Sequence, residues 1–215
     1  DLGARSLVIG DRAFAADKAT IIELAGAYIA GMHDAGMAST GKHFPGHGSV
    51  EADSHTDDVR DAREFAAIEE SDLQPFSQLG SELDAVMMAH VLYPQADSMP
   101  AGYSAFWIQT VLRQQLEFSG TVFSDDLGMF AAKVAGGLAA RVHISLQAGC
   151  DAVLVCDPGD VRQLIDAKGL PDTDASQALT PLKGRFTANR EDVEMVKEWR
   201  QWKTTIEQLE QTRWL

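Results

Sequence analysis

Four short apolar runs, each followed by a stretch of helical periodicity or polar loop, constrain the fold of this 215-residue chain more than any other feature. In chain order they read "MASTGKHF", "DAVMMAHV", "GTVFSDD" and "CDAVLVCDPG". The runs are too short for typical helices, and their hydrophobicity is continuous rather than alternating, which indicates strands buried on both faces. Strands of this kind, separated by helices, predict an α/β fold with a parallel sheet.

The segments between these runs have apolar residues at the spacing of an amphipathic helix. In the first of them, Ile21 and Ile29 belong to one apolar face, Asp17 is placed to cap the helix, and Gly36 lies beyond its end. Ser104 is placed to cap a later helix in the same way. The further helices are expected around residues 65–79, 104–116 and 129–148.

The length and the 45% hydrophobic content are sufficient for one sizeable core, so residues 1–215 are predicted to form a single domain. Near the end of the chain, Trp199, Trp202, Ile206 and Leu209 recur at helical spacing. We therefore expect a closing C-terminal helix over about residues 190–212, packed on the domain through these side chains.

The charge balance excludes two classes of partner. The chain has 18 Lys and Arg against 32 Asp and Glu, a formal net charge of -14, which repels phosphate backbones and anionic lipid surfaces. We expect neither nucleic acid nor membrane as a partner.

No apolar run is long enough to span a bilayer. Cys150 and Cys156, in one predicted buried strand, are too far apart to form a disulfide. Free thiols fit a reducing compartment such as the cytoplasm.

Unusual polar clusters follow each predicted strand at its C-terminal end. They read "KHFPGHG", "AHVLYP", "SDDLGM" and "CDPGD". In parallel α/β folds the chemistry lies at this edge of the sheet, where strands end and loops begin. The acidic pair Asp125 and Asp126 lies where "GTVFS" ends, and a carboxylate there points into the mouth of the sheet.

The stretch "KHFPGHGSVEADSH" contains three of the six histidines of the chain. His43 and His47 have the spacing of two ligands on a helix, but Pro45 and Gly46 disfavour a helix there. A metal site on an irregular loop stays open as an alternative. Its ligands would be His43, His47, Asp53 and His55.

Asp53 and His55 are close enough in sequence for the carboxylate to orient the imidazole and raise its basicity. From their spacing alone, an exposed Asp and His on a polar loop is the favoured interpretation. Together with a carboxylate at the strand end, the pair could supply a nucleophile and an acid/base.

The elements "KHFPGHGSVEADSH", "VFSDDLGM" and "VIGDRAF" together resemble the bacterial β-N-acetylhexosaminidases of glycoside hydrolase family 3, over essentially the whole chain. The resemblance implies a parallel (β/α) TIM-barrel-type fold. It also implies a retaining exo-β-N-acetylglucosaminidase that acts on peptidoglycan fragments, the N-acetylglucosamine-containing muropeptides of cell-wall recycling, without a cofactor and without a metal.

The resemblance also implies roles for individual residues. Asp125 matches the nucleophile, and His55 matches the acid/base, an exception to the usual pair of carboxylates. Asp53 matches the partner that orients His55. The residues that match sugar-binding positions are Arg12, Lys42 and His43. The Pro-Gly content of residues 45–48 suggests a loop that moves and carries the acid/base.

Family members carry an N-terminal segment ahead of the position of Asp1, and the four strands expected here are half of the eight in a closed barrel. The resemblance therefore implies the C-terminal part of the barrel, with an exposed sheet edge. A monomer is expected for the full-length family, and self-association for this short chain if the edge is to be covered. The alternative function is a non-catalytic, sugar-binding or self-associating remnant of such an enzyme.

Overall fold

The structure is a computed structural model that describes residues 1–3, 6, 9–50, 59–167, 169–171, 176–185 and 197–212. The chain divides into two compact units, residues 1–183 and 184–215. The first unit contains the sheet and all four strands, and the second contains the helix α8 (Lys197–Thr212). None of the helices in the described part of the chain is long and apolar enough to cross a membrane.

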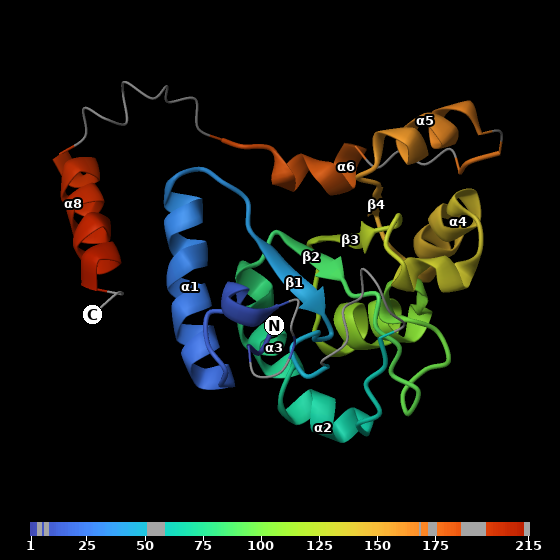
Figure 1. Ribbon diagram of the computed structural model, residues 1–215, viewed down its shortest axis with the longest axis horizontal. Helices are drawn as coiled ribbons and strands as arrows, with labels where there is room; N and C mark the ends of the chain where they lie inside the picture. The colour runs from blue at the N-terminus through green and yellow to red at the C-terminus, as the bar shows by residue number, and fades with distance from the viewer. Residues whose placement is uncertain are drawn as a thin grey trace. The chain divides into compact units, whose positions relative to one another are not determined.

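The first unit is built on a four-stranded parallel sheet in the order β1-β2-β3-β4. Figure 1 shows the four strands side by side with helices around them. The strands follow the four apolar runs, so the predicted α/β fold with a parallel sheet is confirmed. Their bounds are Thr40–Phe44 for β1, Ala85–Met88 for β2, Thr121–Asp126 for β3 and Ala152–Leu154 for β4.

The register of the sheet brings the strand ends to one edge. Met88 of β2 lies opposite Ser124 of β3, and Phe44 of β1 lies opposite Met88. Because all the strands run in the same direction, the polar segments that follow β1, β2 and β3 leave the sheet at the same edge. The expected common edge for the site is thus present.

Helices and helical turns fill the connections between the strands. The α-helices of the first unit are α1 (Lys18–Asp34), α2 (Phe65–Glu70), α3 (Leu73–Leu79), α4 (Leu138–Ala148), α5 (Pro158–Asp166) and α6 (Ser176–Leu179). The remaining turns are η1 (Gly10–Arg12), η2 (Gly80–Glu82), η3 (Ala101–Tyr103), η4 (Phe106–Gln115), η5 (Ala131–Ala135) and η6 (Thr180–Leu182). η4 is a π-helix, whereas the others are 3₁₀ turns.

The predicted helix ends agree with the structure where a capping side chain defines them. Asp17 accepts a hydrogen bond from the backbone N–H of Thr20 at 2.9 Å and begins α1. Ser104 accepts from the N–H of Trp107 at 3.1 Å ahead of η4. The expected helix over residues 65–79 is instead two helices, because α2 ends at Glu70 and the chain turns before α3 begins.

The main core lies between the sheet and the helices α2, α3 and η4. Its largest side chain is Trp107, fully buried, with Phe44 and Tyr93 in edge contact at ring-centroid distances of 6.3 and 5.0 Å. A second cluster, around Leu127 and Leu138, lies beside α4. Burial of aromatic side chains of this size is the main stabilising contribution to such a domain, because each removes a large apolar area from water.

Two features near the chain end differ from expectation or remain untested. Cys150 is buried, but Cys156 lies beyond the end of β4 and is exposed; both thiols are free. Neither cysteine lies within β4 (Ala152–Leu154), whose residues are only partly buried, so the placement of both in one buried strand was wrong. The helix α8 is present over part of the expected range, and Trp202 and Ile206 on it are 61% and 54% exposed. Its packing onto the first unit as one domain stays a prediction.

Candidate active site

The C-terminal end of β3 positions Asp125 at the mouth of the sheet. Its side chain is 20% exposed, and its Oδ1 accepts a hydrogen bond from the backbone N–H of Asp126 at 2.8 Å. The carboxylate is thus held by the backbone of the last residue of the strand. This position is the one expected for a nucleophile at a strand end.

His43, near the end of β1, lies next to this carboxylate although β2 separates the two strands. Its Nε2 is 3.7 Å from Oδ2 of Asp125, and its Nδ1 is 2.6 Å from Oδ2 of Asp1. The imidazole therefore lies between two carboxylates, one at hydrogen-bond distance and one farther away. Two of the predicted site residues, His43 and Asp125, are brought together.

Asp1 is the residue that fixes this histidine, and the sequence reasoning gave it no role. Its Oδ2 accepts from the backbone N–H of His43 at 3.0 Å, and its Oδ1 accepts from that of His47 at 2.7 Å. The same carboxylate also holds the ring of His43. The contacts join residues 42 to 46 positions apart, so no spacing pattern in the sequence could have indicated them.

His43 is neutral in this environment. Burial lowers its pKa to about 4, and although the charge of Asp125 opposes this, the nearby charge of Lys42 adds to the lowering. A neutral ring that donates from Nδ1 to Asp1 has an unprotonated Nε2, which is an acceptor. The 3.7 Å space between Nε2 and Asp125 is therefore bounded by two acceptors, and it suits a hydroxyl group that donates.

The buried neutral state of His43 predicts a pH dependence of stability. In the unfolded chain a histidine has a pKa of about 6.5, so between pH 6.5 and pH 4 the unfolded state binds the proton more readily. The free energy of unfolding is expected to be highest above pH 6.5 and to fall by up to about 3 kcal/mol as the pH decreases to 4. Urea unfolding of the wild-type chain and of His43→Gln measures this, and equal slopes in both proteins would contradict it.

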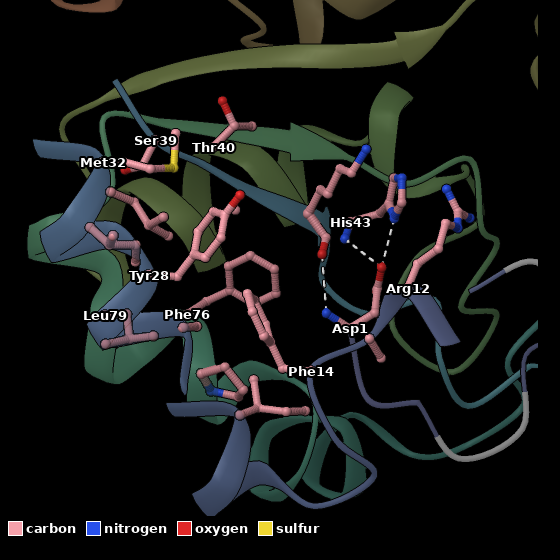
Figure 2. Close-up of a pocket in the computed structure, with 18 of the residues that line it drawn as sticks. Asp1, Arg12, Phe14, Tyr28, Met32, Ser39, Thr40, His43, Phe76 and Leu79 are labelled. Carbon is pink, nitrogen blue, oxygen red and sulfur yellow. Dashed lines mark hydrogen bonds and ion pairs between the residues drawn. The ribbon is translucent and has the colours of Figure 1, made fainter. Parts of the chain in front are cut away.

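Arg12 and Lys42 lie near His43. Both line a cavity of about 440 Å³ together with Asp1 and His43. Figure 2 shows Asp1 directed at His43, with Arg12 beside it and the apolar side chains of Phe14 and Tyr28 farther along the cavity. Three predicted sugar-binding residues, Arg12, Lys42 and His43, thus share one cavity. The cavity changes from polar near β1's end to apolar between α1, α3 and β1.

The loop after β1 is closely packed in the structure. A Cβ atom at Gly46 would lie 2.5 Å from the Cβ of Asp72, and one at Gly48 would lie 1.5 Å from the backbone oxygen of Leu2. The Tyr93 hydroxyl donates to the carbonyl of Gly46. The glycines are therefore required by close approach of other chain segments. Whether the loop moves, as the Pro-Gly content suggested, stays a prediction.

Asp53 and His55 lie outside the residues that the structure describes, so their predicted pairing stays a prediction. The described residues on either side of residues 51–58 are both tied to Asp72. Ser49 donates to its Oδ1 at 3.2 Å, and Arg63 donates to its Oδ2 at 2.8 Å. One buried carboxylate therefore fixes the chain both before and after the predicted acid/base.

Asp126 has a structural position. Its Oδ1 accepts from the backbone N–H of Gly128 and of Cys156, both at 3.0 Å, and so joins the ends of β3 and β4. Among the described residues, no group of three or more His, Cys, Asp or Glu side chains is arranged to hold a metal ion. The loop-borne metal alternative includes Asp53 and His55, which are outside that part of the chain.

Comparison with known proteins gives a consistent result. The profile of the glycosyl hydrolase family 3 N-terminal domain matches residues 1–180. A β-hexosaminidase of Idiomarina loihiensis is 48% identical over 203 residues, which are 94% of this chain and 61% of that protein. One from Pseudomonas aeruginosa is 56% identical over 153 residues, 71% of this chain and 46% of that protein.

Solved structures give the same result. NagZ from Neisseria gonorrhoeae, in complex with N-trifluoroacetyl-D-glucosamine, superimposes with a TM-score of 0.81 at 40% identity. The match covers 91% of this chain and 58% of that one. The predicted TIM-barrel-type fold is thus confirmed for the matched part. The chain spans about three fifths, or less, of the length of these relatives.

Proposed function

The chain belongs to glycosyl hydrolase family 3, and from this premise we propose that it supplies the catalytic residues of a retaining exo-β-N-acetylglucosaminidase. The observation that carries the proposal is the pair formed by Asp125 and His43. A carboxylate at a strand end lies 3.7 Å from the acceptor nitrogen of a neutral imidazole, and that imidazole lines a cavity together with Arg12 and Lys42.

In the proposed reaction Asp125 attacks the anomeric carbon of the sugar and the glycosidic bond breaks, which gives a covalent glycosyl-enzyme intermediate. His55, oriented by Asp53, protonates the leaving oxygen in this step. It then removes a proton from the water that hydrolyses the intermediate. Two inversions at the anomeric carbon give overall retention of configuration.

The proposed binding roles follow from the chemistry of the cavity. A sugar hydroxyl that lies between His43 and Asp125 can donate to either acceptor. Arg12 and Lys42 are cationic donors, which suit hydroxyl and carbonyl oxygens of a sugar. The NagZ relative was solved with N-trifluoroacetyl-D-glucosamine, which supports an N-acylated glucosamine as the ligand.

We further propose that the natural substrates are muropeptides with terminal β-linked N-acetylglucosamine, that no cofactor is used, and that the protein acts in the cytoplasm. These parts of the proposal rest on the resemblance of "KHFPGHGSVEADSH" to the bacterial enzymes of this family. Single-domain packing of the closing helix over about residues 190–212 is proposed with them.

Turnover of para-nitrophenyl N-acetyl-β-D-glucosaminide tests the function. The folded chain is expected to release para-nitrophenol, and proton NMR of the early product is expected to show the β-anomer of N-acetylglucosamine. An early α-anomer would contradict the two-step mechanism. A chelator added to the assay separates this reaction from that of a metal hydrolase, because the proposed steps are insensitive to it.

A second function to be tested is that of a non-catalytic sugar-binding or self-associating remnant of such an enzyme, since the chain covers 61% and 46% of two of its relatives. In that case folded protein would bind N-acetylglucosamine without turnover, or would form oligomers. Isothermal titration and sedimentation velocity on the same preparation distinguish these outcomes from catalysis.

A further inference from the structure

His90 is a buried titratable residue next to the site that the proposed mechanism does not use. It lies two residues beyond the end of β2, which pairs with β3 so that Met88 is opposite Ser124. Continued by two residues, this parallel register places His90 beside the end of β3. The continued register sets His90 opposite Asp126 and Ala89 opposite Asp125, so His90 lies one residue from the level of Asp125 although the two are 35 positions apart in sequence.

The environment of His90 is closely packed and almost closed to solvent. The residue is 2% exposed, and its ring packs on that of Tyr103 with a centroid distance of 5.5 Å. A Cβ atom at Gly102 would lie 3.4 Å from its Nδ1, so the backbone of η3 passes against the ring. The position of the imidazole is thus determined by the chain around it.

Neither ring nitrogen of His90 has a hydrogen-bond partner among the residues that the structure describes. A buried polar group without a partner is destabilising, and an apolar side chain would fill the same volume without that cost. Buried polar atoms of this kind therefore call for a functional or mechanistic explanation.

The charges around His90 indicate its protonation state and its partner. Burial lowers its pKa, and the charges and backbone of Asp125 and Asp126 oppose this lowering. The ring is therefore neutral, with one N–H donor and one acceptor nitrogen. The groups that act on the ring through their charges and their backbone are thus Asp125 and Asp126, the last two residues of β3.

We propose that His90 is a positioning residue for the nucleophile: its single ring N–H is directed at the end of β3 and holds the Asp125 carboxylate toward the cleft. The inference rests on the proposed function and adds a residue to the same site. Catalytic hydrogen bonds are often long or misaligned in a free enzyme and tighten when substrate binds. The absence of a well-formed bond here is consistent with that behaviour.

A neutral donor suits this task. A cation beside Asp125 would stabilise the carboxylate charge throughout and so make it a weaker nucleophile, whereas a neutral N–H orients it with less stabilisation. His43, near the end of β1, is also neutral, and its Nε2 lies 3.7 Å from Oδ2 of Asp125. The nucleophile therefore has two uncharged imidazoles near it, and both come from strands on the same side of β3.

Three variants of His90 test the proposal. His90→Phe keeps an aromatic ring but removes the donor, and it is expected to lower kcat about 100-fold with KM changed less than about threefold. His90→Asn and His90→Gln place an amide N–H near Nδ1 and Nε2, respectively. The variant whose amide N–H takes the place of the donor nitrogen is expected to have a kcat at least about tenfold higher than that of His90→Phe.

A role in packing alone would give a different pattern. His90→Phe would then keep kcat, or all three variants would lose kcat in proportion to their loss of melting temperature, and either result overturns the proposal. Where His90→Phe does not fold, the ratio of kcat between the Gln and Asn variants decides, with the melting temperature of each measured because the two side chains also differ in volume. A kcat difference that only follows the melting temperatures overturns the proposal.

Nitrogen-15 NMR of the His90 ring in the wild-type chain gives a readout that needs no turnover. We expect one neutral tautomer, with a shift that changes in Asp125→Asn but not in the exposed control Asp166→Asn. A ring that does not respond to Asp125→Asn overturns the inference. A responding ring in a chain that does not hydrolyse N-acetylglucosaminides overturns the proposed function instead, so the two failures are distinguishable.

Discussion

Asp125→Ala is expected to lower kcat on para-nitrophenyl N-acetyl-β-D-glucosaminide by about 10⁴-fold or more, because it removes the group that forms the covalent intermediate. The fold should tolerate the change. The Asp125 side chain is partly exposed, and the hydrogen bond that it accepts comes from the adjacent residue at 2.8 Å. Steady-state kinetics and a melting curve of the variant measure the two expectations together.

Chemical rescue makes the test specific. Removal of the carboxylate leaves space next to the anomeric carbon, and azide that enters it would react in a single displacement. The expected product from a β-glycoside is the α-glycosyl azide, which NMR identifies. Removal of a carboxylate other than the nucleophile would not let azide attack that face of the sugar. The α-glycosyl azide would then not form.

Asp126→Asn is the matched control for Asp125→Ala. Asp126 accepts two backbone N–H bonds that join the ends of β3 and β4, so its replacement is expected to lower the melting temperature more than the chemical rate. If Asp125→Ala retains more than about a tenth of the wild-type kcat, another group attacks the anomeric carbon. The acetamido oxygen of the substrate is the obvious alternative, as in substrate-assisted glycosidases.

The sheet was predictable from the sequence because its determinants are local. Each buried strand is a short continuous apolar run, and the Asp17 and Ser104 caps mark where helical segments begin. The break between α2 and α3 was not predicted, since residues 65–79 keep one apolar periodicity across Ser71, where the chain turns. The periodicity of a helix pair that packs on one core resembles that of a single helix.

The candidate site was predictable where residue type and motif coincide, as for His43 and Asp125. The role of Asp1 was not, because a single carboxylate with partners more than 40 positions away has no signature in spacing. The buried cluster of Asp61, Arg63 and Asp72 was also missed. Its residues lie close in sequence but are joined by a loop geometry that polarity patterns do not specify.

That cluster sets the largest expected effect on stability. Arg63 donates to both oxygens of Asp61, at 2.6 to 3.0 Å, and to Oδ2 of Asp72 at 2.8 Å. The Asp61 and Asp72 side chains are 4% and 1% exposed, whereas that of Arg63 is 30% exposed. These hydrogen bonds raise the pKa of Arg63, so it stays a cation. It is the charge that compensates two buried carboxylates.

Arg63→Met is therefore expected to lower the free energy of unfolding by about 3 kcal/mol, near the lower end of the range for breaking a buried ion pair because solvent reaches the guanidinium. Urea unfolding at pH 7 measures it. Adding Asp61→Asn and Asp72→Asn should restore part of the loss, since it removes the uncompensated charges. The control is Arg113→Met, whose partner Asp151 is 28% exposed and also accepts the N–H of Val122.

The same variant connects the cluster to catalysis. Asp72 holds Ser49 and Arg63, the described anchors on either side of residues 51–58, where the predicted acid/base His55 and its partner Asp53 lie in the sequence. Loss of one anchor is expected to lower kcat by about tenfold or more at a temperature where the variant is fully folded, because misplacement of a catalytic group by a fraction of an ångström is costly. Arg113→Met should leave kcat within about twofold of the wild type, since its pair lies at the opposite, N-terminal end of β3. If Arg63→Met unfolds within about 1 kcal/mol of the wild type and keeps its kcat, then the two carboxylates are compensated by other groups and the anchoring role of Asp72 is wrong.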